Sequence, residues 1–302
     1  MHLEHGKIAV AILMGTLARL YMLRIDYRQY PSYPHGYAVH MSLGFIASSL
    51  GALAIPTLLK KDYMAVTILA LAAQQFREVR DMERRSLQDL EDTELVPRGS
   101  AYIDGIAKVF EARNYLAMFT ALVTSLAAFT LPFNTNLDLV LAVLSGLVTM
   151  FSLNFLMRGK RVRDIAIVRE GHLHFVGSLL LVEDVVLTNI GLAESREMIL
   201  ARGLGVTIEP KDDNARATLF NLGQRQAIAH DASAIMGVRL DVSEREFTPL
   251  VRVNPNTGRI VMAIVPMEKD IECLLEAVRR VPVLESSVRK PISTKAGRVA
   301  SD

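Results

Sequence analysis

The sequence predicts a membrane-embedded all-α bundle of about five transmembrane helices, followed by a soluble α+β domain for which a ferredoxin-like fold is expected. Apolar residues make up 51% of the 302-residue chain, and its mean hydropathy is +0.27, which is above the average for soluble proteins. These apolar residues are concentrated in the first half of the chain. From Asp164 onward, shorter patterns typical of a soluble domain replace them.

Five apolar stretches are candidates for crossing a bilayer, which requires about 20 mostly apolar residues. They are residues 8–23, 37–59, 63–76, 115–133 and 137–157. Arg19 interrupts the first stretch and is expected to reach the interface from near a helix end. The second stretch is rich in small residues, which favour close helix packing in lipid. The third stretch is short for a full crossing.

The distribution of basic residues predicts the orientation of the bundle. The segments 24–36, 77–114 and 157–164 would lie on one face and together carry 13 Lys and Arg residues, against three on the opposite face. Because cytoplasmic loops are enriched in Lys and Arg, we expect the N-terminus outside the cell and the C-terminus in the cytoplasm. If the short third stretch does not cross, the faces exchange. The expected organisation is a transmembrane domain (1–157) with a cytoplasmic loop (77–114), a soluble cytoplasmic domain (158–285) and a disordered tail (286–302).

The soluble domain shows a strand and helix order of β-α-β-β-α, which resembles a small ferredoxin-like sandwich. Alternating apolar residues around a Glu-Gly pair predict a strand–turn–strand unit over 164–177. Asp212 and Asp213 are candidate caps for one long helix. The remaining predicted elements are a strand at 204–210, that helix at 214–236, a hairpin over 247–265 and an amphipathic helix at 268–280.

Composition and motifs exclude several classes of function. The net charge of +2 and the absence of Trp argue against a nucleic-acid partner. A single cysteine excludes an intrachain disulfide and a multi-cysteine zinc site. The chain has no phosphate-binding P-loop, nucleophile elbow or dinucleotide-binding glycine motif. We therefore expect no cofactor and no metal.

Polar residues of the membrane half gather at its predicted cytoplasmic end. Two carboxylates there, Asp26 and Asp104, could share a proton and activate water, as aspartic protease pairs do, with Glu111 or His35 assisting. The alternative is a solvated helix face, because Asp104, Lys108 and Glu111 fall at i, i+4 and i+7 and would form a favourable charge ladder.

The hexapeptide Tyr102-Ile103-Asp104-Gly105-Ile106-Ala107 lies in this region. ELVPRG precedes it, KVFEARNYLAM follows it, and RQYPSYPHGY lies further upstream. Together these stretches resemble the YIEGIA family, multi-pass membrane proteins of endospore-forming bacteria. The family motif has Glu where this chain has Asp104, so a carboxylate is kept but is one methylene shorter. The LVPRGS within the upstream stretch matches a thrombin site, and we interpret it as a natural turn.

Two functions remain open from the sequence. The first, to which the resemblance adds a hint of regulated proteolysis during sporulation, is a membrane-anchored protease or protein-turnover regulator in the bacterial cytoplasmic or spore membrane. Its catalytic residues would be Asp104, Asp26, Glu111 and His35. The alternative is a non-catalytic membrane scaffold that recruits partners through its cytoplasmic domain. The expected partners are the lipid bilayer and a membrane or cytoplasmic protein, while the oligomeric state stays open. A transporter is disfavoured, because the ionisable residues of the spans lie near their predicted ends.

Overall fold

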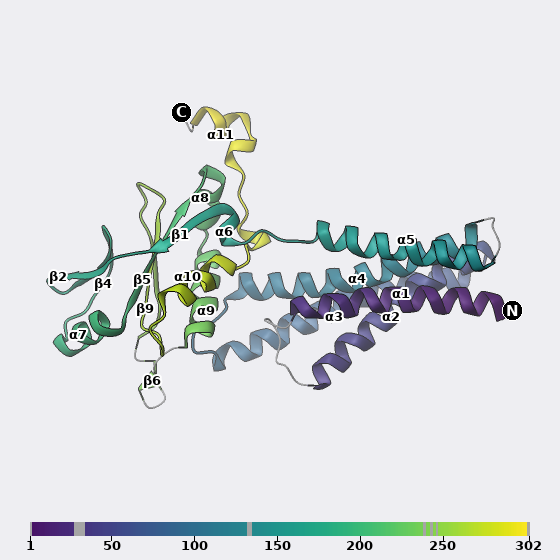
Figure 1. Ribbon diagram of the computed structural model, residues 1–302, viewed down its shortest axis with the longest axis horizontal. Helices are drawn as coiled ribbons and strands as arrows, with labels where there is room; N and C mark the ends of the chain where they lie inside the picture. Colours follow the sequence, from purple (N-terminus) through teal and green to yellow (C-terminus); the bar gives the residue numbers. More distant parts are fainter. Residues whose placement is uncertain are drawn as a thin grey trace. The chain divides into compact units, whose positions relative to one another are not determined.

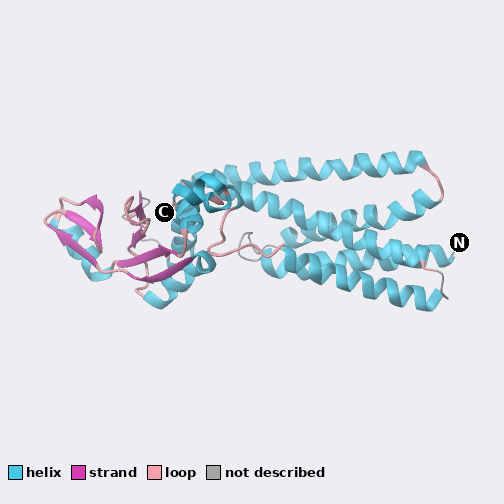
Figure 2. Ribbon diagram, turned by 90° about the horizontal axis from the view of Figure 1, so that it is seen from above, coloured by secondary structure: helices cyan, strands magenta, loops and turns pink. Residues whose placement is uncertain are grey.

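The computed structural model describes residues 2–26, 34–131, 135–237, 240–241, 244–245 and 247–300 (Figure 1). The chain divides into two compact units. Unit 1 comprises residues 1–85 and 106–158, and unit 2 comprises residues 86–105 and 159–302. A mostly helical N-terminal part therefore precedes a part that contains the sheets, which confirms the predicted order of fold classes (Figure 2). Residues 86–105 belong to unit 2, although the sequence pattern places them in a loop of the membrane domain.

Unit 1 is built from helices that alternate in direction. They are α1 (His2–Asp26), α2 (Pro34–Leu59), the first part of α3 (Tyr63–Leu90), most of α4 (Ser100–Thr130) and α5 (Thr135–Leu156). Ion pairs fix one end of the bundle, where Glu4 on α1 meets Lys60 just after α2 at 2.8 Å, and Lys7 on α1 meets Asp138 on α5 at 3.8 Å. The start of α1, the end of α2 and the start of α5 therefore lie at the same end.

The predicted loop 77–114 is mostly helical. Helix α3 continues to Leu90, the short 3₁₀ turn η1 (Glu91–Thr93) follows, and α4 begins at Ser100. The apolar first half of α3 and its charged second half form one uninterrupted helix, because no Gly or Pro separates them. The sequence pattern identified the change of polarity but not the continuity of the backbone.

Small residues bring α1, α2 and α4 into close contact. A Cβ atom at Gly15 would lie 2.6 Å from the Ala117 carbonyl oxygen, and one at Gly51 would collide with the carbonyl oxygen of Met118. The Ser125 hydroxyl on α4 also donates a hydrogen bond of 2.8 Å to the Ala52 carbonyl on α2. This is the packing expected in lipid, where small residues allow backbones to approach closely.

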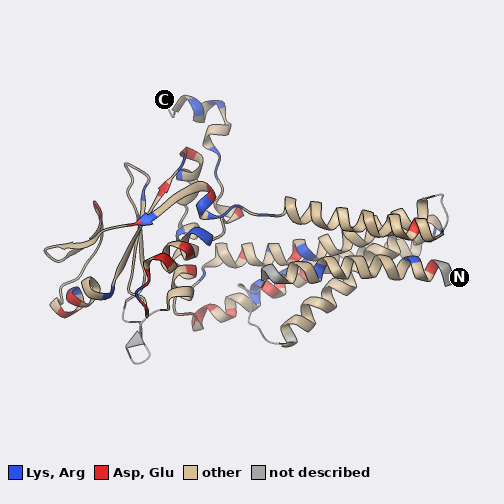
Figure 3. Cartoon of the chain, in the orientation of Figure 1, with Lys and Arg blue, Asp and Glu red and all other residues tan. Residues whose placement is uncertain are grey.

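Three helices in the described ranges are long and apolar enough to cross a membrane, over Glu4–Leu23, Gly36–Leu59 and Asn136–Leu156. Large apolar side chains point outward from them, including Phe45 on α2 and Phe155 on α5, and α5 is almost free of charge along its length (Figure 3). The predicted spans 63–76 and 115–133 are not among them: the apolar part of α3 is short, Arg113 and Asn114 directly precede the apolar part of α4, and residues 132–134 lie outside the described ranges. The count of five spans stays a prediction.

Unit 2 contains an antiparallel sheet with the strand order β1-β5-β9-β8. Its strands are β1 (Ala166–Glu170), β5 (Leu204–Pro210), β8 (Leu250–Val253) and β9 (Ile260–Ile264). Every residue of β9 is buried, so both faces of this central strand are covered. Between β5 and β8 the chain forms α8 (Asp213–Leu219) and α9 (Leu222–Met236), and α10 (Ile271–Arg280) follows β9. Because β5 and β8 both pair antiparallel with β9, they run parallel to each other with β9 between them.

A second sheet covers one face of the first. It has the order β2-β3-β4, formed by β2 (Leu173–Val176), β3 (Leu179–Val182) and β4 (Val185–Asn189), and α7 (Ala193–Arg202) follows it. Val182 and Leu187 from this sheet, Ile199 from α7, and Val261 and Ala263 from β9 share one buried cluster. The remaining elements of unit 2 are α6 (Val162–Ile165), β6 (Leu240–Asp241), β7 (Glu244–Arg245), η2 (Glu285–Ser287), η3 (Pro291–Ser293) and α11 (Lys295–Ala300).

The 164–177 unit contains the two predicted strands, β1 and β2, but they do not pair with each other, because β1 pairs with β5 and β2 pairs with β3. The chain leaves the first sheet at Gly171, whose N–H donates to the Gly205 carbonyl at 2.9 Å. The predicted helix 214–236 is two helices, since the Asn221 side chain accepts a hydrogen bond from the Gln224 N–H and caps a new helix. The predicted hairpin over 247–265 and the cap at Asp212 are confirmed.

Part of the predicted disordered tail makes specific contacts. Gln224 on α9 is fully buried, its amide donates to the Pro282 carbonyl, and its oxygen accepts from the Leu284 N–H and the Ser287 hydroxyl. Further along, the N–H of Arg289 donates to the Thr218 hydroxyl at 3.1 Å. A polar and basic composition indicated disorder, but these backbone hydrogen bonds to buried side chains hold the segment in place.

Candidate functional site

Residues 94–105, which we call the motif segment, dock along one face of helix α9. The Val96 carbonyl accepts a hydrogen bond of 2.6 Å from the Nδ1 atom of His230, and the Pro97 carbonyl accepts one of 2.5 Å from the Gln226 side chain. Because a carbonyl can only accept, the His230 proton lies on Nδ1. At the start of α9, a Cβ atom at Gly223 would lie 2.6 Å from the Cβ of Ala101. Residues 223, 226 and 230 recur at helical spacing and form a single docking face.

Tyr102, the first residue of the hexapeptide, is the side-chain anchor of this contact. Its ring is 6% exposed and lies edge-on to the His230 ring at 6.1 Å between centroids. Its hydroxyl lies 3.0 and 3.1 Å from the two carboxylate oxygens of Asp231, to which it donates. Hydrogen bonds to charged groups are among the stronger ones. The tyrosine of the motif therefore serves packing and hydrogen bonding within unit 2.

The turn before α4 is shaped by charged side chains and one glycine. The carboxylate of Glu91 accepts from the backbone N–H groups of Arg98 and Gly99, and the Arg98 guanidinium lies 2.6 Å from Glu94. Gly99 has φ of +83°, a conformation that L side chains rarely adopt. The LVPRGS stretch is thus an ordered turn that starts α4, which supports its interpretation as a natural part of the chain.

The structure describes two of the four predicted catalytic side chains, Asp104 and Glu111, and the assembly of the four into a site stays a prediction. Asp104 and Glu111 lie on the same helix, α4, about 10 Å apart along its axis, whereas carboxylates that share a proton lie about 3 Å apart. Glu111 instead forms an ion pair with Arg80 on α3 at 3.5 Å. The side chains of Asp26 and His35 lie outside the described residues, so the pairing of Asp26 with Asp104 stays a prediction.

Other residues of the hexapeptide are buried. Ile103 and Ile106 are 1% and 2% exposed, and Ala107 is fully buried, while Asp104 is only partly buried. The apolar positions of the motif are therefore packing positions. No group of three or more potential metal ligands occurs among the described residues, and the expectation of no metal stays a prediction.

Unit 1 contains a buried polar cluster that the sequence pattern missed. Arg19 is fully buried, not extended to an interface as predicted; its guanidinium lies 2.8 Å from the His40 Nδ1 atom and 5.4 Å from the Phe110 ring centre. The physical reason is Gly44, because a Cβ atom there would collide with the Arg19 side chain. The sequence feature that could have indicated this site is the spacing of His40 and Gly44, which lie four positions apart and therefore on the same face of α2. Arg113 and Asn114 are also buried on α4, so the bundle interior is more polar than predicted.

The whole chain resembles a defined group of proteins. The family model described as YIEGIA protein matches residues 7–294. A protein of Bacillus subtilis (strain 168) named "Uncharacterized protein YphB" is 42% identical over 284 residues, which cover 94% of this chain and 94% of the relative. No solved structure matches the chain. Since both similarities extend over nearly its full length, the chain belongs to the YIEGIA protein family.

Proposed function

We propose that this chain is a non-catalytic integral membrane protein that recruits a protein partner through its cytoplasmic α+β domain. In this proposal, the motif segment is a structural part of the domain and holds the start of α4 on α9. The observation that carries the proposal is the engagement of Tyr102 with Asp231 and His230. Tyr102 of the family motif docks on α9 within the same unit, so this motif residue serves the folding of the domain and not a reaction.

The arrangement within unit 1 supports five crossings with the N-terminus outside and the C-terminus in the cytoplasm. Its helices alternate in direction, and the end that holds Lys60 and Glu4 has few basic residues. The arginines of α3, at positions 77, 80, 84 and 85, lie toward the opposite end. An excess of Lys and Arg is typical of the cytoplasmic side. For the soluble domain, the parallel pair β5 and β8 with β9 between them supports a ferredoxin-like assignment in which β1 supplies the fourth strand.

The competing proposal is a membrane-anchored peptidase that uses Asp104 as an acid–base group, and one substitution separates the two. Asp104→Asn keeps the size of the side chain and removes its charge. In a bacterial host whose own YIEGIA gene is deleted, we expect this variant to complement the deletion as well as the wild-type chain does. A chain truncated after Asp164 should fail to complement, because it lacks the recruiting domain.

Membrane levels of both variants are compared by immunoblot, and Asp92→Asn serves as a control at an exposed carboxylate. Loss of complementation by Asp104→Asn at normal membrane level would favour the peptidase and reject the scaffold. Complementation by the truncated chain would show that the soluble domain is not the working part.

A further inference from the structure

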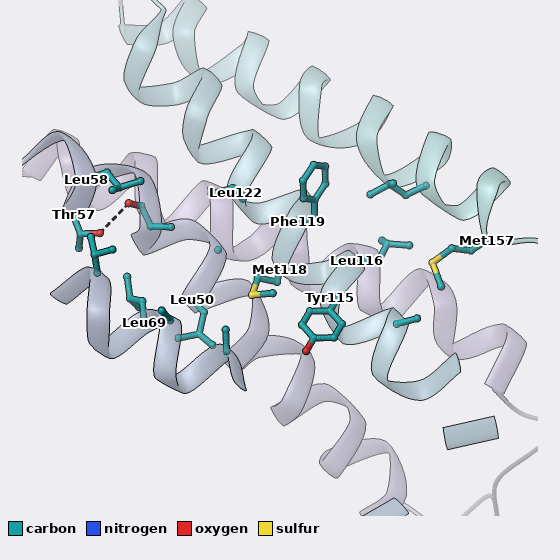
Figure 4. Close-up of a pocket in the computed structure, with 17 residues that line it drawn as sticks. Leu50, Thr57, Leu58, Leu69, Tyr115, Leu116, Met118, Phe119, Leu122 and Met157 are labelled. Atoms are coloured by element: carbon teal, nitrogen blue, oxygen red, sulfur yellow. Dashed lines mark hydrogen bonds between the residues drawn. The ribbon is translucent and has the colours of Figure 1, made fainter. Parts of the chain in front are cut away.

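Unit 1 contains an apolar groove of about 590 Å³ between α2, α3, α4 and α5 (Figure 4). Leu50 and Leu58 on α2, Leu69 on α3, and Met118 and Phe119 on α4 are among its lining residues. The Thr57 hydroxyl at its edge is already bonded to the Ala54 carbonyl at 2.9 Å. The groove therefore offers an apolar surface that suits an aliphatic or acyl chain, and it has little hydrogen-bonding capacity along most of its length.

One end of the groove is polar. Tyr115 lines the groove and brings its hydroxyl to this end (Figure 4). The Tyr115 ring packs on Phe76 with 6.1 Å between ring centroids, and Phe76 directly precedes the first arginine of α3. Tyr115 thus lies level with the boundary between the apolar and the charged halves of α3.

The lining stripe of α3 continues directly into a basic stripe. Residues on one helix face recur at intervals of three and four. The α3 residues that line the groove are Val66, Leu69, Ala70 and Ala73, and the same spacing then reaches Arg77, Arg80 and Arg84. Glu111 offsets the charge of Arg80 at 3.5 Å and Asp81 lies 3.7 Å from Arg84, while the Arg77 side chain is exposed. An apolar lining followed by exposed positive charge is complementary to an amphiphile that has an apolar chain and an anionic head group.

The size of the groove distinguishes a lipid chain from a partner helix. Pockets for small molecules have volumes of about 300–1,000 Å³, and this groove falls within that range. A transmembrane helix about 10 Å wide and 30 Å long has a volume on the order of 2,000 Å³, which is too large to enter it. Anionic lipids interact favourably with Lys and Arg near a membrane surface, by about 1 kcal/mol for each residue.

We propose that this groove binds an anionic membrane phospholipid, with an acyl chain along Leu69, Ala73 and Phe119 and the phosphate at Arg77 beside Tyr115. The inference concerns a ligand of the bundle and goes beyond partner recruitment. It rests on the membrane location proposed above but not on the scaffold role. Binding of a specific lipid would link the lipid composition of the membrane to the packing of α3 against α4.

The test uses the absence of Trp from the chain. Phe119→Trp places a single fluorophore in the groove, and the full-length protein is reconstituted in phosphatidylcholine vesicles that contain increasing fractions of phosphatidylglycerol with brominated acyl chains. Bromine quenches Trp on contact. We expect half-maximal quenching at about a fivefold lower mole fraction of brominated phosphatidylglycerol than of brominated phosphatidylcholine, the factor that corresponds to about 1 kcal/mol.

Two changes in the Phe119→Trp background should remove the preference. Arg77→Gln deletes the proposed phosphate contact, with Arg85→Gln as its control off the basic stripe. Ala73→Leu fills the groove, with Ala72→Leu as its control, because Ala72 does not line the groove. Phe155→Trp reports on the outer surface of α5, where Phe155 is 70% exposed, and should be quenched by both lipids without preference.

The outcomes separate the inference from the membrane location. Quenching at position 155 without any lipid preference at position 119 would overturn the lipid site and leave the membrane location intact. Absence of quenching at position 155 would overturn the membrane location itself. A preference for phosphatidylglycerol at position 119 that persists in both the Arg77→Gln and the Ala73→Leu variants would also reject the site. So would protection of position 119 from brominated lipid by a bound polypeptide, such as a second copy of the chain.

Discussion

Tyr102→Ala is expected to destabilise unit 2 by about 3–5 kcal/mol, the usual cost of removing a buried aromatic ring. The ring is 6% exposed and its hydroxyl bonds to Asp231, so the change removes both packing and a charge-assisted hydrogen bond. For a unit of this size, each kcal/mol lowers the melting temperature by about 2–4 °C. Differential scanning calorimetry of the full-length protein in detergent should therefore show a decrease of about 10 °C in the transition of unit 2.

Tyr102→Phe is the matched control, because it keeps the ring and deletes only the hydroxyl. Its cost should be about 1.5–3 kcal/mol, the range for a hydrogen bond to a charged group. In a double-mutant cycle with Asp231→Asn, the two effects should not add, since both changes remove the same bond. Full additivity, or a melting temperature unchanged by Tyr102→Ala, would show that Tyr102 does not dock on α9.

Gly51→Ala is the second change with a large expected effect. We expect it to lower the stability of the bundle, although helix propensity alone would raise it. Alanine is a better helix former than glycine by about 1 kcal/mol. At Gly51, however, the new Cβ would collide with the Met118 carbonyl oxygen on α4, which is backbone and cannot move alone. Overpacking of this kind typically costs about 1–3 kcal/mol. We expect a lower melting temperature for the bundle in detergent.

Gly6→Ala provides the control for this effect. Gly6 lies on α1 with no heavy atom within 4 Å of an added Cβ, so the substitution should leave the melting temperature unchanged or raise it slightly. Opposite signs for the two variants would identify the contact between α2 and α4 as the cause. Two equal shifts would indicate that only helix propensity is being measured.

Local sequence patterns predicted the elements that depend on local physics. The apolar stretches gave the helices of unit 1, Asp212 was recognised as a cap because its side chain can reach the nearby N–H of Ala215, and the NPNTG turn predicted the β8–β9 hairpin. The pairing of β1 with β5 joins residues 36 to 44 positions apart, and no local pattern encodes such a partner. The second sheet was also missed, although its strands pair with their neighbours in sequence, over separations of 3 to 10 positions.

The functional region shows the same division. The sequence pattern drew attention to the hexapeptide, and we interpreted its Asp104 as a candidate catalytic carboxylate. The structure shows Tyr102 bonded to Asp231, 129 positions along the chain, a contact that depends on where α9 packs. Likewise, Arg19 was expected to reach water because a single helix offers no partner for it, whereas Gly44 on the next helix leaves room for its side chain. Polar groups that find partners on distant elements cannot be assigned from one sequence.

The most direct test of the docked motif segment uses the LVPRGS sequence itself. Thrombin cleaves after the arginine of this sequence, Arg98, and must bind the segment in an extended form. In the folded chain, Val96 and Pro97 are bonded to α9 and Arg98 is held by Glu94. Cleavage then requires local opening, and an opening free energy of about 3 kcal/mol gives about 100-fold protection.

The measurement compares two cleavage rates in one protein that carries a second LVPRGS copy appended after Asp302. We expect thrombin to remove the appended copy at least about 100-fold faster than it cuts between Arg98 and Gly99, and Tyr102→Ala to accelerate the internal cut. Cleavage of the internal and appended copies at equal rates in the wild-type chain would show that residues 94–105 are not docked on α9, and the structural role assigned to the YIDGIA hexapeptide would be wrong.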